Sequence, residues 1–580
     1  MRVLRWLVVL ILSAGVPCRA LPAGGGKSAY RISGVVLSSR DGSPVPFSRL
    51  DATLGNEQAP VPRGPGVRGG MRQGGRVARG WENEVVADEH GRFLMELPSA
   101  GSWQVTAGGR GFHRQHYDEH EGYFSGIVLT EAKPAVEVTF RVAPDATISG
   151  LVLDEAGEAV QGAQVWVEFS QTESEDLLRG ERRQAGFSQT DDRGRYELTG
   201  LSPGSYVVRV QAHPWYAQGV ALPRSNSRTD AALDVVYETV WYPGATDPRG
   251  AEVIRLAGGE ERQADFHLAA IPAAHLRIDP LGVPAQMRDG DVRPRSQRSA
   301  SLIRVSPEGG FSQTTNGDGA DFGSLVPGVY RLEMRGDDGQ VEGQVRHIRV
   351  LPGAAGVVDL SSATVLTQVK LLLDGVEEGQ VGPINLIDTV TRQSVTAGGG
   401  NRGFGRGLRQ RTGGEADGER KVRERVVYLA PGTYEVRLAA RGPNFITGLE
   451  AMGAQVSGLS VTVGSTEATI TVKLASGKGT VSGVAKMGAN ELQGAMVLLV
   501  PAMLGQPGNA SGIECDQTNS DGSFRIEGVI PGKYILLAID HGWDVNWHDA
   551  QTLAGYLSHG VPVEVGAGMR LVRTIEAVRP

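Results

Sequence analysis

Residues 116–120 read HYDEH, in which His116, Glu119 and His120 have the residue types and spacing of a zinc site. Two imidazoles and a carboxylate can hold Zn²⁺ and activate water when a helix presents them together and a further ligand completes the site. His113 lies just upstream as a possible further ligand. Glycines bracket the stretch between two predicted strands, so we expect a polar surface loop without a cofactor, with a structural or adventitious metal and then a catalytic metal as alternatives.

Aromatic residues beside polar ones form a second group with recognisable chemistry. A sugar ring offers C–H faces to an aromatic plane and hydroxyls to polar neighbours, and exposed Trp and Tyr supply such a surface. The alternative is that these rings close the open end of a β-sandwich core. The predicted carbohydrate-binding residues are Trp215, Tyr216, Trp241, Tyr242, Trp543 and Trp547.

Other kinds of chemistry find little support in the sequence. There is no G-x-S-x-G elbow and no phosphate-binding G-x-x-x-x-G-K-[ST] loop. The chain has 65 acidic and 58 basic residues and a net charge of −7, which argues against nucleic acid as a partner. Gly/Arg-rich segments at 60–80 and 398–425 are predicted as insertion loops, disordered or in contact with anionic polysaccharide.

The N-terminus predicts export from the cytoplasm. Arg2 and Arg5 precede an apolar run of about ten residues, a pattern typical of a signal peptide over residues 1–20. A membrane anchor would need about 20 apolar residues, and no later stretch provides them. Lipidation of Cys18 is an alternative to cleavage near Ala20. We expect a secreted, periplasmic or cell-surface protein whose remaining Cys515 has no disulfide partner.

A motif recurs along the chain and must position these residues. Residues 191–210 read DDRGRYELTGLSPGSYVVRV and residues 521–537 read DGSFRIEGVIPGKYILL. The motif has four parts at fixed spacing: a turn with Asp and Gly, a segment of alternating apolar and polar residues, a Pro-Gly turn and an aromatic residue. A third copy ends at Trp103. The shorter Pro-Gly-x-Tyr half recurs twice more. The predicted corner tyrosines, whose hydroxyls return to the upstream backbone, are Tyr206, Tyr330, Tyr434 and Tyr534.

Extended segments flank every copy, and those at its start are spaced like a hairpin. Regular short strands with turn signals predict an all-β protein, a tandem array of Ig-like or transthyretin-like antiparallel β-sandwiches. The predicted units are residues 29–143, 145–270, 271–361, 362–476 and 477–580.

The combination of S-G-x-V, G-A-x-V, D-x-x-G-x-Y and P-G-x-Y resembles the carboxypeptidase regulatory-like domain, most clearly at 146–212 and 480–540. The resemblance implies a seven-stranded transthyretin-like sandwich, grouped with carbohydrate-binding-like folds and ordinarily the companion of a peptidase. No peptidase domain is recognisable in this chain. We therefore predict a non-enzymatic envelope or secreted protein that binds a polysaccharide, a cell-surface glycan or other envelope proteins. The alternatives are a structural or adhesive spacer and an accessory module to a separate peptidase.

Overall fold

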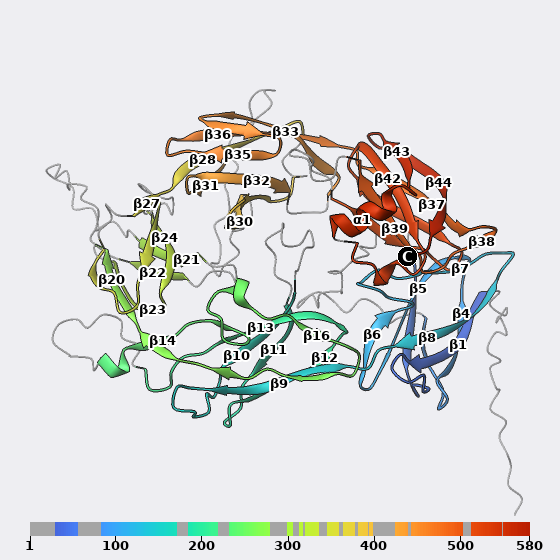
Figure 1. Cartoon of the computed structure of the whole chain (residues 1–580), viewed down its shortest axis with the longest axis horizontal. Helices are drawn as coiled ribbons and strands as arrows, with labels where there is room; N and C mark the ends of the chain where they lie inside the picture. Colours follow the sequence, from blue (N-terminus) through green and yellow to red (C-terminus); the bar gives the residue numbers. More distant parts are fainter. Residues whose placement is uncertain are drawn as a thin grey trace, which may run out of the picture.

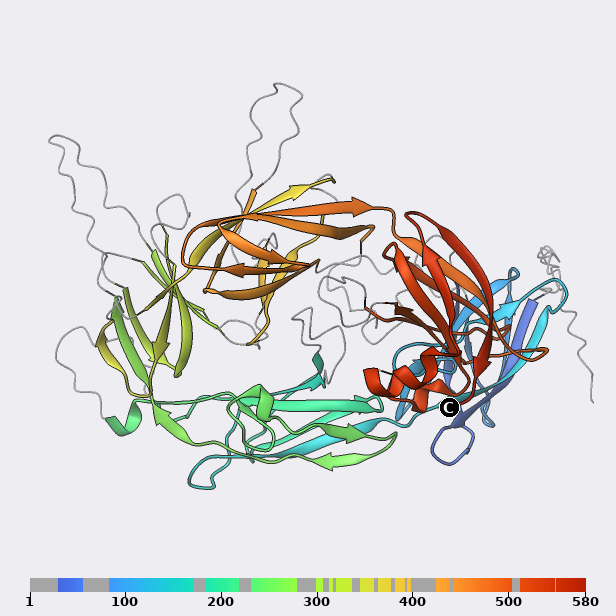
Figure 2. The same cartoon turned by 45° about the horizontal axis from the view of Figure 1, so that its top comes forward.

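The computed structural model consists of five β-sandwiches that follow one another around a closed ring (Figure 1). In Figure 2, turned by 45°, the last sandwich (red) again lies against the first (blue). The structure describes residues 30–55, 83–170, 184–217, 231–278, 299–305, 312–316, 320–335, 345–358, 363–376, 381–391, 394–397, 424–438, 442–502, 512–547 and 549–580. The predicted signal peptide, Cys18 and segment 60–80 lie outside these residues, as does segment 398–425 apart from its last two residues.

The first sandwich packs a three-stranded sheet against a five-stranded one. The smaller sheet has the order β4-β1-β8 and the larger the order β3-β2-β5-β6, with β7 also paired to β5. Its strands are β1 (Tyr30–Ser38), β2 (Arg49–Leu54), β3 (Glu84–Val86), β4 (Arg92–Leu97), β5 (Gly101–Gly109), β6 (Phe112–His116), β7 (Ile127–Leu129) and β8 (Ala135–Val142). The alternating burial of strands such as β4 places one face of each sheet in a shared core around Trp103 and Phe140.

The second sandwich repeats this plan, with sheets β12-β9-β17 and β11-β10-β13-β15. Strand β18 also pairs β9, β16 also pairs β13, and β14 pairs β19. The strands are β9 (Ala146–Leu153), β10 (Gln164–Phe169), β11 (Gln184–Gln189), β12 (Arg195–Leu201), β13 (Gly204–Gln211), β14 (Val235–Tyr237), β15 (Val240–Trp241), β16 (Ile254–Leu256), β17 (Glu261–Gln263), β18 (Phe266–His267) and β19 (Ala270–Pro272). Two 3₁₀ turns, η2 (Ala231–Leu233) and η3 (Pro248–Gly250), lie among the later strands.

The third and fourth sandwiches have the same two-sheet arrangement. In the third, the sheets are β23-β20-β26 and β22-β21-β24-β25-β27. Its strands are β20 (Ala274–Ile278), β21 (Ser299–Arg304), β22 (Ser312–Asn316), β23 (Ala320–Leu325), β24 (Gly328–Arg335), β25 (Arg346–Val350), β26 (Ala355–Val357) and β27 (Thr364–Val365). In the fourth, the sheets are β31-β28-β36-β33 and β30-β29-β32-β35-β34. Its strands are β28 (Thr367–Asp374), β29 (Ile384–Asp388), β30 (Ser394–Ala397), β31 (Glu424–Leu429), β32 (Gly432–Leu438), β33 (Asn444–Met452), β34 (Ala454–Ser457), β35 (Ser460–Val463) and β36 (Ala468–Ser476).

The fifth sandwich differs because its last strand joins the two sheets. Strand β44 pairs β37 along most of its length and β42 at its end, so the strands form one eight-stranded sheet. Its strands are β37 (Gly479–Met487), β38 (Asn490–Glu491), β39 (Met496–Pro501), β40 (Glu514–Gln517), β41 (Ser523–Val529), β42 (Gly532–Ile539), β43 (Val561–Val565) and β44 (Arg570–Val578). The 3₁₀ turn η5 (Gly542–Asp544) and helix α1 (Ala550–Leu557) lie between β42 and β43. In the described part of the chain no helix is both long and apolar enough to cross a membrane.

The predicted hairpin-like start does not pair the two long strands of a copy, although β37 and the short strand β38 do form a hairpin in the fifth sandwich. Strand β1 pairs antiparallel with β4 and parallel with β8, whereas β2 lies in the other sheet and pairs β3 and β5. The same separation holds for β9 and β10, and in every sandwich the first strand pairs parallel with a strand near the end of the unit. The turn between the first two segments therefore carries the chain from one layer to the other.

The glycine of the S-G-x-V motif makes room for this parallel pair. A Cβ on Gly150 would lie 2.2 Å from the carbonyl oxygen of Ala264 and 2.9 Å from the ring of Tyr196. Gly483 meets a last-strand carbonyl and an aromatic ring in the same way, with Phe524 in place of the tyrosine. The two halves of the motif are thus coupled, because the aromatic residue of D-x-x-G-x-Y packs over the glycine of the first strand.

Candidate functional site

The four corner tyrosines are buried and each makes the same hydrogen bond. Their hydroxyls donate to the carbonyl oxygen four residues upstream, at 2.6 Å for Tyr206, 2.7 Å for Tyr330 and Tyr434 and 2.5 Å for Tyr534. Burial raises the pKa of Tyr330 and of Tyr434 to about 12. These phenols are neutral and occupied, so their role is to fix the Pro-Gly corner.

Trp103 serves as the corner residue of the first sandwich. Its indole nitrogen donates to the carbonyl oxygen of Ser99 at 3.1 Å, again four residues upstream. The side chain is 2% exposed and belongs to the core. A tryptophan can replace tyrosine here because the corner needs only a buried ring with a donor at its edge.

Trp215 is the predicted sugar-binding residue that presents an open ring. It is 79% exposed at the tip of a turn closed by a hydrogen bond from the amide of Ala217 to the carbonyl of Pro214 at 3.0 Å. Tyr216 packs edge-on against its indole, with ring centroids 5.7 Å apart and planes at 90°. The Tyr216 hydroxyl donates to the carboxylate of Glu155, and this contact adds to burial in raising its pKa to about 12. The turn is therefore anchored while one indole remains in solvent.

Trp241 and Tyr242 lie in the same sandwich, with Trp241 buried and Tyr242 partly buried. Trp241 has no exposed surface and is the last member of a cross-strand row in which Phe187, Trp166 and Arg209 precede it. The guanidinium of Arg209 lies 4.2 Å from the ring centroid of Trp166 and forms an ion pair with Glu168 at 2.8 Å. Tyr242 packs against the core of the second sandwich. Stacking of a sugar on Trp241 would require the row to open.

Trp543 and Trp547 contact the first sandwich. We call this contact the end-to-end interface; it joins residues 117–128 to residues 493–494, 517–520, Trp543 and Trp547. The Trp543 ring stacks on His120, with centroids 5.5 Å apart, and on Tyr123, with centroids 5.4 Å apart. Trp547 is 6% exposed, and its indole nitrogen donates to Glu121 at 3.1 Å.

The HYDEH stretch does not gather its side chains around one point. His116 ends strand β6, its ring stacks on Phe124 at 4.0 Å between centroids, and its amide donates to the Glu119 carboxylate at 2.7 Å. His120 turns to the other sandwich, where its Nδ1 lies 3.2 Å from the side-chain oxygen of Gln517. The amide of His113 donates to the carbonyl of Ala143. Among the described residues no group of three or more His, Cys, Asp and Glu side chains could hold a metal ion.

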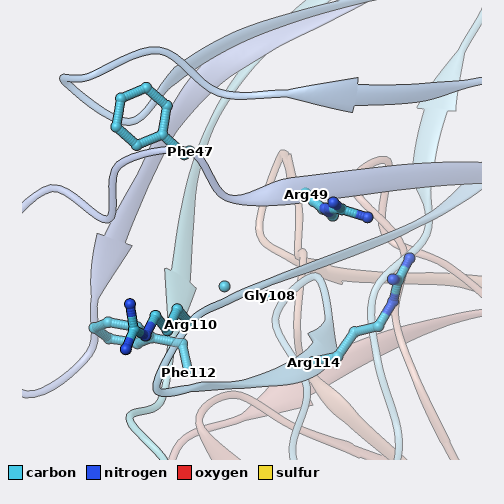
Figure 3. A pocket seen from close by; sticks show the side chains of 7 residues that line it. Phe47, Arg49, Gly108, Arg110, Phe112 and Arg114 are labelled. Atoms are coloured by element: carbon cyan, nitrogen blue, oxygen red, sulfur yellow. The ribbon is translucent and has the colours of Figure 1, made fainter.

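A shallow hollow of about 390 Å³ lies on the larger sheet of the first sandwich (Figure 3). Two of its three arginines have carboxylate partners, since Arg49 lies 3.9 Å from Glu84 and Arg114 pairs with Asp51. Figure 3 shows the side chains of Arg49, Arg110 and Arg114 at separate places along its rim. The lining residues are Phe47, Arg49, Gly108, Gly109, Arg110, Phe112 and Arg114, which include no nucleophile and no general base. The sequence interpretation did not identify this hollow, because its residues come from separate strands.

Cys515 lies in the fifth sandwich without a disulfide partner. Burial raises the pKa of its thiol well above the usual value, and the carboxylates of Asp516, Glu121 and Glu514 add to this effect. A thiol held protonated in this way is a poor nucleophile.

The fold and these sites describe an all-β protein of tandem Ig-like sandwiches, and one part of it matches a known family. Residues 147–235 match the family model of the carboxypeptidase regulatory-like domain. The matched residues begin with β9 and end at the start of β14, before the strands β17 and β18 that complete the smaller sheet. A search of curated proteins gives no match.

The chain is also similar to solved bacterial structures, among them two pilins. The Bacillus anthracis TIE protein is 12% identical, with 91% of this chain and 68% of that chain covered and a TM-score of 0.14. A streptococcal ancillary pilin is 13% identical, with 53% and 99% covered and a TM-score of 0.19. The minor pilin GBS52 of Streptococcus agalactiae is 10% identical, with 42% and 97% covered and a TM-score of 0.20. At these values the comparisons carry no argument about function.

Proposed function

We propose that this chain is a non-enzymatic binding scaffold of the cell envelope or the exterior, and that it contacts carbohydrate through the turn at residues 214–217. The observation that carries the proposal is the 79% exposure of Trp215 on an anchored turn. An exposed indole whose position is fixed before binding loses little conformational entropy when a sugar stacks on it. Export rests on the predicted signal peptide.

The surroundings of Trp215 favour a neutral sugar over an acidic one. The Glu155 carboxylate accepts a hydrogen bond from the Tyr216 hydroxyl, and burial together with the nearby charges of Glu155 and Asp154 raises the pKa of Tyr237. Carboxylates accept hydrogen bonds from sugar hydroxyls but repel uronic or sulfated sugars. We therefore expect uncharged hexose polymers as the ligand class.

A binding role without catalysis is supported by the chemistry of the described residues. The described hollow is lined by Arg, Phe and Gly, the HYDEH stretch is divided between two contacts, and the pKa of Cys515 is raised. None of these arrangements places a nucleophile beside a base.

The test compares glycan binding by the full mature chain and two variants. We expect the wild type to bind neutral glycans and Trp215→Ala to lose at least about tenfold in affinity, the scale of one removed stacking partner. Phe187→Ala is the matched control, because Phe187 is an exposed aromatic residue of the same sandwich at 49% exposure. Equal binding by wild type and Trp215→Ala, or no binding by the wild type to neutral and acidic sugars, would contradict the proposal. The second outcome would favour a structural or adhesive scaffold, for which the end-to-end interface is the specific support.

A further inference from the structure

We infer that the end-to-end interface is an intramolecular docking surface, and that it keeps the chain closed as a ring in solution. The occupant of the surface on the fifth sandwich is the segment 117–128 of the same chain. The inference is independent of carbohydrate binding, since Trp215 makes no contact at this interface.

Three backbone amides donate hydrogen bonds across the interface, one to a backbone carbonyl and two to side chains. The amide of Gly126 donates to the side-chain oxygen of Asn519 at 2.9 Å, and the amide of Ser520 donates to the carbonyl of Gly126 at 2.9 Å. The amide of Val128 donates to the hydroxyl of Ser520 at 2.8 Å. A Cβ on Gly126 would lie 2.4 Å from the Ser102 hydroxyl oxygen of its own sandwich and 2.8 Å from the Asn519 oxygen, so a larger residue here would crowd both sides.

The turn that reaches across departs from its counterparts in the other sandwiches. In the first two sandwiches the turn begins with Asp88 or Asp191, and each carboxylate accepts two amides of its own turn. The fifth sandwich has Asn519 at this position, 7% exposed, with its oxygen on Gly126 and its amide donating to Ser523. A neutral amide avoids burying an unpaired carboxylate, and it supplies a donor as well as an acceptor.

The centre of the interface is polar and its side chains are matched across it. The Gln517 side chain has no exposed surface and donates to the Asp118 carbonyl at 2.5 Å and to the Ser125 hydroxyl at 2.9 Å. Ser125, also buried, donates to the carbonyl of Thr518 at 2.8 Å. A buried polar network with partners on both sides specifies one registry, because any shift leaves donors unsatisfied.

The segment on the first sandwich adopts a backbone that needs outside support. Asp118 and Glu121 have φ values of 55° and 50°, in the left-handed region that disfavours residues with a Cβ. Such conformations persist where surrounding contacts hold them. Here Gln517 contacts Asp118, and Trp547 contacts Glu121.

Contacts between neighbouring sandwiches favour a closed ring in which both surfaces of the end-to-end interface belong to the same chain. Arg40 donates to the carbonyl of Gly259 at 3.3 Å between the first and second sandwiches, and His275 lies 2.6 Å from Asp234 at the boundary of the second and third. Head-to-tail contacts close a ring when the rotations sum correctly and otherwise build filaments. Tethering both halves to one chain raises their effective concentration and favours closure within it.

Hydrogen exchange of the full mature chain tests the inference at the three amides that cross the interface. We expect Gly126, Val128 and Ser520 to be protected in the wild type, to the same degree at all protein concentrations. Gln517→Glu places a carboxylate beside Asp118 and removes the amide donor, so protection of Gly126 and Val128 in the other sandwich should fall by roughly tenfold or more. Gln189→Glu is the matched control, an exposed glutamine at a strand end whose change should leave all three amides protected.

The reciprocal variant tests the same contact from the other side. Gly126→Ala, in the first sandwich, should lower the protection of Ser520 in the fifth, while the paired strands β39 and β42 keep theirs and report that the domain is folded. Unprotected interface amides in the wild type, or protection unchanged in both variants, would overturn the inference. Protection that rises with concentration together with a mass of two or more chains would also overturn it, because the surface would then bind a second copy.

Discussion

Replacing Gly150 with alanine should unfold the second sandwich at much lower denaturant concentration than the wild type. The backbone of Gly150 does not require a left-handed conformation, so the substitution tests packing alone. The added methyl would lie 2.2 Å from the Ala264 carbonyl oxygen, more than an ångström inside ordinary contact. The strand segment around residues 263–266 must therefore move away from β9.

Three hydrogen bonds depend on that segment staying in place. The amide of Ala264 donates to the carbonyl of Ser149 at 2.8 Å, and the amide of Leu151 donates to the Asp265 carboxylate at 2.8 Å. The Tyr196 hydroxyl donates to the carbonyl of Ala264 at 2.5 Å. At about 1 kcal/mol for each bond, with about 1–3 kcal/mol for the forced displacement, the loss is roughly 4–6 kcal/mol. This is a large share of the about 5–15 kcal/mol that stabilises an ordinary domain.

The assay is urea unfolding followed by tryptophan fluorescence, since Trp166 and the buried Trp241 lie on paired strands of this sandwich. Gly244→Ala is the control, because a Cβ there meets nothing within 4 Å, and its midpoint should stay near that of the wild type. If Gly150→Ala unfolds at the same urea concentration as the wild type, the conclusion that a glycine is needed for the segment around Ala264 to pack against β9 is wrong.

Further consequences concern single side chains elsewhere. Tyr206→Phe should destabilise the second sandwich by about 1–3 kcal/mol in the same urea assay, because it removes the hydrogen bond of a buried phenol to the carbonyl of the half-buried Ser202. Burial and the charge of Arg331 lower the pKa of His347, so the unfolded chain binds a proton on this residue more readily than the folded chain does. The third sandwich should therefore lose stability as the pH drops through about 6.5, the ordinary pKa of histidine. In His347→Gln the melting temperature should change less between about pH 7.5 and 5.5 than it does in the wild type. Gly555→Ala should stabilise the fifth sandwich by up to about 1 kcal/mol, because the residue lies inside α1 with open space around it; a lower melting temperature would contradict this.

The strand class and the repeating corners could be predicted because they depend on local chemistry. Gly194 and Gly522 have φ values of 71° and 73°, as a turn that only glycine tolerates easily would require. The Pro-Gly-x-Tyr spacing places each hydroxyl over a carbonyl four residues back, a distance that the local chain determines. The pairing of β1 with β8 could not be predicted in the same way, because it joins residues about a hundred positions apart and alternation along a strand does not identify its neighbour.

The candidate sites were less accessible to sequence interpretation. Trp215 and Trp543 both follow a Tyr-containing strand in aromatic and polar segments, yet one is 79% exposed and the other stacks on His120 of a distant sandwich. What separates them is a partner surface more than 390 positions away along the chain. A signal was nevertheless present at Asn519, which stands where two other copies have aspartate and needs a different partner for its side chain.

The HYDEH stretch shows how backbone conformation determines what a residue pattern can do. On a helix, residues 116, 119 and 120 would lie on one face and their side chains could share an ion. Here the chain leaves strand β6 at His116 and passes through turns with left-handed residues at Asp118 and Glu121, so the stretch is not helical. His116 consequently packs on Phe124 of its own sandwich, while His120 reaches Gln517 of the last one. The stretch that suggested a metal site instead presents Asp118 and His120 to Gln517 of the fifth sandwich, which is why the same residues support ring closure.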